Sequence, residues 1–211
     1  LLYFNFQMPF FKEITVKKNI RILIWKIDEK LSDLKALILL TEDQKRELER
    51  RKPISNKKQY LASRKLIRMA ELNELNNNLY ESPSLKKNVC YSISHTMKFA
   101  VLGIGVQKIG VDIESYRPKI LHIKSKFINI KESYFMKSDD IEIITRLWTC
   151  KEAIYKCIVK KKLSFKKDIV LEKFDMQAKF GRGEVYLKGK IIPINLHFSN
   201  FENHQLTMSY L

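Results

Sequence analysis

The sequence contains no long apolar run. A membrane-spanning helix needs about 20 consecutive, mostly apolar residues, and no stretch of this chain approaches that length. A secretory signal is also missing, because a basic head, a long apolar stretch and a small-residue cleavage site do not occur together. We therefore expect a cytoplasmic protein with no membrane partner.

Cysteine is scarce as well. The 3 cysteines, Cys90, Cys150 and Cys157, have no Cys-x-x-Cys spacing of the kind that binds a metal. Cys150 and Cys157 stand two turns apart on one expected helix, which is too far for a disulfide. We expect buried free thiols in a reducing compartment.

Basic residues, in contrast, are abundant. The 40 lysines and arginines outnumber the 23 acids and give a formal net charge of +17. Such a surplus attracts polyanions, which include nucleic acid, anionic membranes, acidic proteins and phosphorylated cofactors. It does not choose among them, and a mostly solvated lysine surface explains it equally well. Apolar residues make up 45% of the chain, so a packed core is expected.

The chain divides into groups of expected helices and strands. Residues 1–7 look like a tag remnant before Met8 and are left out of the fold. Apolar alternation predicts a strand at 20–27. Further short strands are predicted at 89–94, 99–106, 109–114, 169–174, 184–187, 191–198 and 204–210. Helices are predicted at 31–40, after a capping box at Thr41, from Ser55 to about Leu75, and from about Asp139 to Val159 after a cap at Ser138. Strands in hairpin-like clusters favour an α+β fold with antiparallel sheets, in two parts at 8–108 and 109–211.

Two acids lie on one short expected strand. Residues two apart on a strand point the same way and lie about 7 Å apart, so Asp112 and Glu114 share one face. Val111 and Ile113 then face the core. Two carboxylates at this spacing can share a divalent cation such as Mg²⁺. The alternative is an exposed strand face with ordinary surface acids.

A third acid lies in the helical segment from Leu147 to Lys156. Glu152 and Lys156 are one turn apart and can meet on one face. They can supply a further metal carboxylate beside a phosphate-binding cation, or form an ordinary salt bridge on a solvated helix. Trp148 is expected in the core.

A polar turn, Ser92-Ile93-Ser94-His95-Thr96, ends one of the strands. Ser94 and His95 can donate hydrogen bonds to phosphate oxygens from such a turn. Nucleophilic catalysis by this pair is not favoured. Adjacent residues cannot easily form the bond between a nucleophile and its base, and no glycine elbow surrounds the serine.

In order and spacing, the three motifs resemble those of the 4'-phosphopantetheinyl transferases, specifically the larger, Sfp-like, single-chain branch. The resemblance consists of Ser-x-Ser-His, then Gly-Val-Asp-Ile-Glu, then Trp-Thr-x-Lys-Glu-Ala-x-x-Lys, and it extends to Leu163–Asp168. The helix around Tyr60 to Arg68 resembles the family's basic helix. The implied fold has two similar halves, each a small antiparallel sheet packed with a long helix. The active site would lie in the cleft between them.

The resemblance also implies roles for individual residues. Asp112, Glu114 and Glu152 match the family's Mg²⁺-binding acids, and Lys156 matches its phosphate-contacting lysine. The general base would be Glu152 or Glu132, the latter matching an additional acid of some members. Contacts to coenzyme A are implied for Arg64, Ser94 and His95.

The implied reaction moves the 4'-phosphopantetheine group of coenzyme A onto a serine of an acyl or peptidyl carrier protein, and 3',5'-ADP leaves. Carrier proteins are typically acidic, so a basic surface would steer the partner, and the large branch usually acts as a monomer. Two segments depart from the family pattern. Glu81-Ser82-Pro83 replaces Gly-Lys-Pro, so Lys86 or Lys87 would have to replace its lysine, and a lysine in 160–162 replaces a glycine.

Two other classes of protein compete with this interpretation. A nucleic-acid-binding module would need basic residues interleaved with stacking aromatics, or a known binding motif, and neither occurs. A degenerate family member would bind coenzyme A or a carrier protein without catalysis. The three retained acids, Asp112, Glu114 and Glu152, argue against that alternative.

Overall fold

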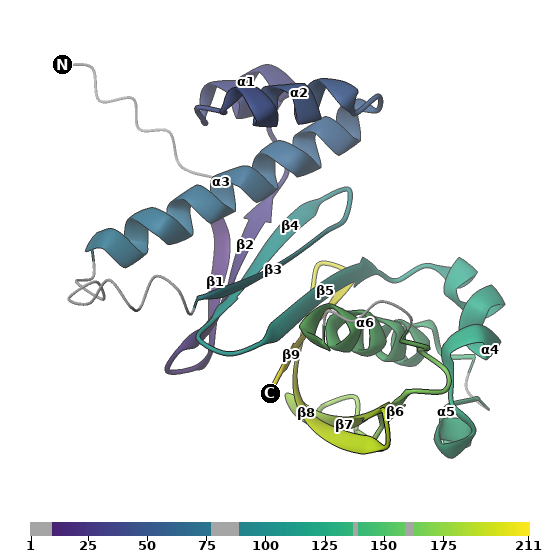
Figure 1. The fold of residues 1–211 in the computed structure, drawn as a ribbon. Helices are drawn as coiled ribbons and strands as arrows, with labels where there is room; N and C mark the ends of the chain where they lie inside the picture. The colour runs from purple at the N-terminus through teal and green to yellow at the C-terminus, as the bar shows by residue number, and fades with distance from the viewer. Residues whose placement is uncertain (1–9, 77–88, 137–138, 159–162) are drawn as a thin grey trace.

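Two antiparallel sheets and two long helices form the framework of the protein (Figure 1). The structure is a computed structural model that describes residues 10–76, 89–136, 139–158 and 163–211. The suspected tag remnant, the stretch from Glu81 to Lys87, Ser138 and the lysines at 160–162 lie outside these residues. No helix among the described residues is long and apolar enough to cross a membrane.

The four-stranded sheet has the order β1-β2-β4-β3. Its strands are β1 at Phe10–Lys17, β2 at Ile20–Lys26, β3 at Cys90–His95 and β4 at Phe99–Gly105. The five-stranded sheet has the order β5-β9-β8-β7-β6. Its strands are β5 at Ile109–Ser115, β6 at Ile169–Leu171, β7 at Phe180–Leu187, β8 at Lys190–Phe201 and β9 at His204–Tyr210.

The helices belong to both halves of the chain. They are α1 at Leu31–Ala36, α2 at Glu42–Arg50, α3 at Ile54–Asn76, α4 at Lys124–Phe127, α5 at Ser133–Met136 and α6 at Ile141–Ile158. Short 3₁₀ helices occupy Pro118–Ile123 and Ile130–Glu132. Each sheet is packed with one long helix, α3 or α6, which confirms the predicted α+β fold.

Three apolar clusters join these layers. Leu61 and Leu66 of α3 pack on one face of the four-stranded sheet. The opposite face of that sheet packs on β5 and β9, and α6 covers the other face of the five-stranded sheet. Each fully buried leucine or isoleucine in these clusters contributes about 1.5–3 kcal/mol relative to an exposed side chain. The five-stranded sheet therefore lies between α6 and the four-stranded sheet.

Differences from the predicted elements have local causes. Helix α3 begins at Ile54, so Ser55 lies inside its first turn and is not its cap. Helix α6 is capped by Asp140, whose carboxylate accepts a hydrogen bond from the Glu142 backbone N at 2.8 Å. The capping box at Thr41 is confirmed. Strand β1 was not predicted, because it is an edge strand whose pairing with β2 is irregular at two places.

The two sheets meet where the edge strands β3 and β5 lie side by side (Figure 1). The Ser92 hydroxyl accepts a hydrogen bond from Val111 N at 2.9 Å, and the Ser94 hydroxyl accepts one from Ile113 N at 3.4 Å. Serine hydroxyls therefore take the place of the backbone-to-backbone hydrogen bonds that usually join adjacent strands. We call this contact between β3 and β5 the seam. Both serines come from the polar turn that the sequence analysis singled out.

The cysteines are free, as expected. Cys150 and Cys157 are buried on α6, and Cys90 on β3 is half-buried. Burial raises the pKa of Cys150 to about 12 and that of Cys157 to about 11. Both α6 thiols therefore stay protonated and unreactive at neutral pH.

Candidate active site

Gly110 allows α6 to lie directly on β5. A Cβ at this position would overlap the Ala153 carbonyl oxygen and come within 2.6 Å of Cys157 N. Both are backbone atoms of α6, so any side chain at Gly110 would displace the helix. Asp112 and Glu114 follow on the same face of the strand, and they therefore lie beside α6 rather than facing open solvent.

Asp112 has two differently occupied carboxylate oxygens. The residue is buried, with 5% of its surface exposed. Its Oδ1 accepts hydrogen bonds from the Ser94 hydroxyl and from Lys156 Nζ, both at 2.8 Å. Its Oδ2 is buried and has no hydrogen-bond partner among the described residues. An exposed strand face of ordinary surface acids is therefore excluded for Asp112.

Lys156 joins α6 to the seam between the sheets. Besides its ion pair with Asp112, its ammonium donates to Val111 O at 3.0 Å and to Ile93 O at 3.4 Å. The ion pairs of the described residues include none between Glu152 and Lys156. The simple salt bridge along a solvated helix is thus not formed, because Lys156 turns toward β5 instead.

Glu114 and Glu152 are half-buried neighbours of Asp112. Burial, and then the Asp112 charge, raise the pKa of both carboxyls above its usual range. Arg117 partly offsets this for Glu114 through an ion pair at 3.1 Å, and Lys156 does so for Glu152. The three acids therefore repel one another across a shared space, which a bound cation would relieve.

The three acids do not enclose a metal by themselves. Across the described ranges, no three His, Cys, Asp or Glu side chains are gathered closely enough to hold a metal ion. Mg²⁺ is usually held by one or two carboxylates, with waters and substrate phosphates completing its shell. A partly open set of carboxylates such as Asp112, Glu114 and Glu152 suits that kind of binding.

His95 lies at the end of β3, at the junction of two cavities. One cavity, of about 330 Å³, is bordered by Arg51, Tyr60, Arg64 and His95. The next, of about 380 Å³, extends from His95 to Glu114. Burial, and then the charges of Lys156 and Arg51, lower the pKa of His95. The imidazole is therefore neutral at pH 7, with one nitrogen able to donate a hydrogen bond.

Arg64 shares the first cavity with a second arginine that the sequence analysis did not single out. The guanidinium groups of Arg51 and Arg64 lie 4.6 Å and 5.1 Å from the centre of the Tyr60 ring. A terminal nitrogen of Arg51 is paired with Glu47 at 3.0 Å, but the buried Nε atoms of both arginines have no hydrogen-bond partner among the described residues. In the sequence, Arg51 only looks like a helix-end cation, so no local signal identified it.

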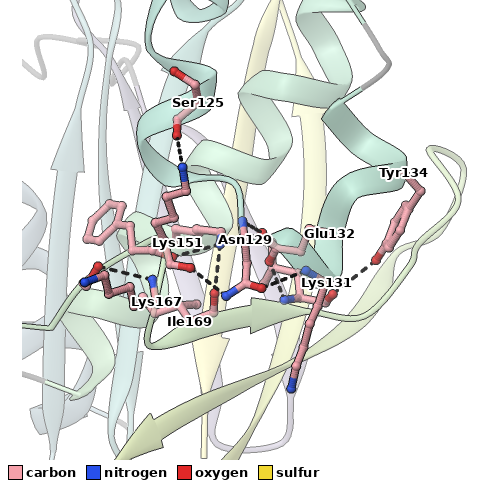
Figure 2. A network of polar contacts seen from close by, with 12 residues as sticks. Ser125, Asn129, Lys131, Glu132, Tyr134, Lys151, Lys167 and Ile169 are labelled. Atoms are coloured by element: carbon pink, nitrogen blue, oxygen red, sulfur yellow. Dashed lines mark hydrogen bonds and ion pairs between the residues drawn. The ribbon is translucent and has the colours of Figure 1, made fainter.

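Glu132 is not brought to the other acids. Figure 2 shows it beside Lys151, at the end of the 3₁₀ helix Ile130–Glu132. Its Oε2 accepts from Lys151 Nζ and from Asn129 N, both at 2.7 Å, and its Oε1 accepts from Leu171 N at 2.6 Å. Both side chains of the ion pair are fully buried. Both oxygens of Glu132 are therefore already engaged in holding three chain segments together.

The comparisons with known proteins concern the second half of the chain. The family model of the 4'-phosphopantetheinyl transferase superfamily matches residues 108–210. This stretch begins just before β5 and ends in β9, so it includes Asp112, Glu114, Glu152 and Lys156. A search of the curated proteins found no match. The match supports a transferase of this kind, and the Sfp-like branch stays a prediction.

Proposed function

We propose that this protein transfers 4'-phosphopantetheine from coenzyme A to a serine of an acyl or peptidyl carrier protein and releases 3',5'-ADP. The observation that carries the proposal is Asp112, a buried carboxylate. One of its oxygens is held by Ser94 and Lys156, and the other has no partner in the part of the chain that the structure describes. An unsatisfied buried polar group costs about 1–3 kcal/mol. Such a cost is typical of a group that serves a ligand, and the superfamily match includes Asp112.

The carboxylates suit a hard divalent cation such as Mg²⁺. Their oxygens are the ligands that Mg²⁺ prefers, and the repulsion among them is a reason to bind positive charge. Asp112, Glu114 and Glu152 would hold the ion. When bound, it would offset negative charge on the coenzyme A pyrophosphate.

Cationic and polar side chains would bind the phosphates. Lys156 lies beside Asp112 and is 28% exposed, so its ammonium can turn from the carboxylate to a phosphate oxygen. His95 and Ser94 stand at the end of β3, next to the same space. Arg64 borders the adjoining cavity with a buried Nε that has no partner among the described residues. Together these residues would orient the pyrophosphate relative to the acids.

Glu152 is the proposed general base. It lies near Asp112 and Glu114, whereas both oxygens of Glu132 are engaged with Lys151, Asn129 and Leu171. Glu152 would take the proton of the carrier serine hydroxyl. The serine oxygen then bonds to the phosphorus attached to pantetheine. The bond from that phosphorus to the bridging oxygen breaks, and 3',5'-ADP leaves with the bond electrons.

The net charge of +17 would guide an acidic carrier protein toward the site. Such steering is screened by salt, because the Debye length is only about 8 Å at physiological ionic strength. We place the reaction in the cytoplasm and expect the protein to act as a monomer.

The experiment is an intact-mass measurement on a panel of purified apo carrier proteins, incubated with this protein, coenzyme A and Mg²⁺. We expect one phosphopantetheine to be added to at least one carrier, and no addition by the Asp112→Ala variant. The modified carriers identify the pathway. No addition by a folded protein that binds coenzyme A would contradict the enzymatic proposal and favour a degenerate binder.

A further inference from the structure

The turn that carries His95 is held from both halves of the chain. This turn, residues 95–98, connects β3 to β4 and is closed by a hydrogen bond from Thr96 N to Phe99 O at 2.8 Å. From the first half, Gln59 on α3 donates to Thr96 O at 3.0 Å. From the second half, residues 109–211, His204 at the start of β9 brings its Nε2 to 3.2 Å from the Thr96 hydroxyl.

The hydrogen bonds around His204 determine which ring nitrogen carries the proton. Its Nδ1 lies 2.7 Å from Glu202 O, and a carbonyl oxygen can only accept, so Nδ1 is the donor. The Thr96 hydroxyl oxygen already accepts from Lys98 N and Phe99 N, so its hydrogen is free to point at Nε2. In the neutral ring, Nε2 carries a lone pair and accepts this hydrogen.

The surroundings of His204 favour the neutral ring. The residue is 4% exposed and packs edge-on against the Phe99 ring, with ring centres 5.0 Å apart. Burial lowers the pKa of His204 below its usual range. The hydrogen bond to Glu202 O acts against burial, and the charges of Lys98 and Arg117 lower the pKa further. Because both ring nitrogens are already engaged, His204 acts on a ligand only through the turn that it holds.

The turn depends on such support because His95 is exposed over part of its surface. An exposed side chain has few packing contacts, so the backbone of the turn decides where the imidazole lies. Along the seam, Ser92 and Ser94 hold β3 to β5. The last of these bonds is at Ser94, one residue before His95. The bond between Thr96 and His204 continues the attachment on the other side of His95.

We propose that His204 is a positioning residue, whose unprotonated Nε2 accepts the Thr96 hydroxyl and thereby holds His95 in place beside the cavity that it shares with Glu114. The inference rests on the proposed function in one respect, namely that His95 contacts coenzyme A. Small displacements of such a contact weaken binding and catalysis. A ligand that spans both halves should therefore lose affinity without this bond. A cation held by the acids of the second half alone should not.

The first test reads the tautomer in the wild type without any ligand. Long-range proton–nitrogen NMR of the protein with ¹⁵N-labelled histidine shows which ring nitrogen is protonated. We expect His204 to carry its proton on Nδ1 at pH 7, and its Nε2 to have the chemical shift of an unprotonated nitrogen. The signal is assigned by its loss in His204→Gln. A proton on Nε2 would overturn the inference.

The second test compares two variants that both remove the imidazole. His204→Phe keeps an aromatic ring but has no acceptor, whereas His204→Gln keeps a side-chain oxygen that can accept the Thr96 hydroxyl. Coenzyme A binding is measured by calorimetry, and urea unfolding of the same samples establishes that each variant is folded. We expect His204→Phe to bind coenzyme A roughly 3- to 10-fold more weakly, as is typical for the loss of one hydrogen bond. His204→Gln should recover part of this loss.

The effect of Mg²⁺ separates the positioning of His95 from a disturbance of the acids. The rise in melting temperature caused by Mg²⁺ should be equal in the wild type, His204→Phe and His204→Gln. A smaller rise in the variants would show that His204 acts on the acids and would overturn the inference. Unchanged coenzyme A binding in His204→Phe, or no recovery in His204→Gln, would overturn it as well.

Lys26→Gln is the matched control for a contact between the two halves. Lys26 on β2 forms a surface ion pair with Glu202 at 2.9 Å, but it takes no part in the hydrogen bonds of His204. Surface ion pairs contribute little to stability, so Lys26→Gln should bind coenzyme A as the wild type does. An equal loss in Lys26→Gln and His204→Phe would overturn the specific role of His204.

The same measurements separate the inference from the proposed function. If the wild type does not bind coenzyme A, the proposed function fails and the positioning role fails with it. If the wild type binds coenzyme A and His204→Phe binds it equally well, only the inference fails.

Discussion

Two lysines on α6, five residues apart, each form an ion pair with a carboxylate, but the two pairs are built differently. Lys151 and Glu132 are fully buried, while Lys156 is 28% exposed and Asp112 is 7% exposed at the side chain. The ammonium of Lys151 also donates to the carbonyl oxygens of Phe165 and Ile169, each at 2.9 Å (Figure 2).

The two carboxylates differ in how many of their oxygens accept hydrogen bonds from the described residues. Glu132 receives hydrogen bonds on both oxygens, whereas Asp112 keeps a buried Oδ2 that no described residue satisfies. A buried pair with every group satisfied fixes chain segments in place. A pair with one free oxygen and a partly exposed lysine can exchange its partners for a ligand. Hydrogen-bond saturation therefore distinguishes the Glu132–Lys151 pair, which holds chain segments together, from the Asp112–Lys156 pair, which we propose serves a ligand.

The largest effect on the free energy of unfolding is expected for the Glu132–Lys151 pair, in which both carboxylate oxygens accept hydrogen bonds. Glu132→Ala leaves the Lys151 ammonium buried without its carboxylate, and such a change typically costs 3–5 kcal/mol of stability. Urea unfolding should show a lower midpoint by a corresponding amount. The double variant Lys151→Met with Glu132→Leu should recover only part of the loss, because it leaves no uncompensated charge but still leaves the buried Asn129 and Leu171 N–H groups without their acceptor. A Glu132→Ala variant as stable as the wild type would contradict the structural role of this pair.

The next prediction separates the effect of a substitution on activity from its effect on stability at the Asp112–Lys156 pair. Asp112→Asn should lower carrier modification by roughly 10²–10³-fold, as is typical when a group that stabilises transition-state charge is lost. Its unfolding midpoint should change little, because the lost attraction to Lys156 is offset by the lost repulsion from Glu114 and Glu152. The measurements are transfer rates by intact mass and urea unfolding on the same samples. If the variant loses activity only in proportion to its loss of folded protein, Asp112–Lys156 would be a structural ion pair like Glu132–Lys151. The proposed distinction between the two pairs would then be wrong.

A smaller effect is expected from Mg²⁺ alone. At one to ten times its dissociation constant, a ligand that binds only the folded state adds about 0.4–1.4 kcal/mol. Thermal unfolding of the wild type should therefore shift upward with Mg²⁺, and that of Asp112→Ala should not. Equal shifts in both proteins would show that the ion binds elsewhere.

The smallest effect concerns the pH dependence of stability. Because burial and Asp112 raise the pKa of Glu152 in the folded state, the ionised side chain destabilises the fold. Below the unfolded-state pKa of about 4.3 the acid is protonated in both states, and Glu152→Gln should match the wild type. As pH rises through the higher folded-state pKa, the wild type loses stability relative to the variant.

At neutral pH without divalent ions, Glu152→Gln should thus melt higher, by roughly 1–3 °C for a chain of this size. Thermal unfolding at acid and neutral pH measures the difference. Glu49→Gln is a matched control, because it removes one exposed acidic charge on α2, away from Glu114 and Glu152, and should show no such dependence. A wild type more stable than Glu152→Gln at neutral pH would contradict the prediction.

Local patterns in the sequence were sufficient to predict β5 and α6, the strand and the helix that carry the candidate site. Alternation predicted β5 and the common face of Asp112 and Glu114, and helical spacing predicted α6. Both signals depend on neighbours within one or two turns of chain, where sequence and geometry are directly linked.

Contacts between distant segments were not predictable. The sequence left open whether Lys156 forms a salt bridge with Glu152 or binds a phosphate, and it did not predict that Lys156 pairs with Asp112. This pairing arises because α6 lies directly on β5 at Gly110. The pairing of Glu132 with Lys151, and the place of Arg51 beside Tyr60, also depend on how the elements pack. Residue types alone could not separate a fully engaged acid such as Glu132 from the acids at the site.

The serine-bridged seam between β3 and β5 has a consequence for assembly. At this seam the two sheets are joined by hydrogen bonds to serine hydroxyls, which two separate chains could also form. In this protein, however, residues 106–108 connect β4 covalently to β5. A site formed between separate subunits loses population on dilution, whereas a short tether keeps both partners at a high local concentration. The site at this seam is therefore assembled in every folded molecule, however scarce the protein is.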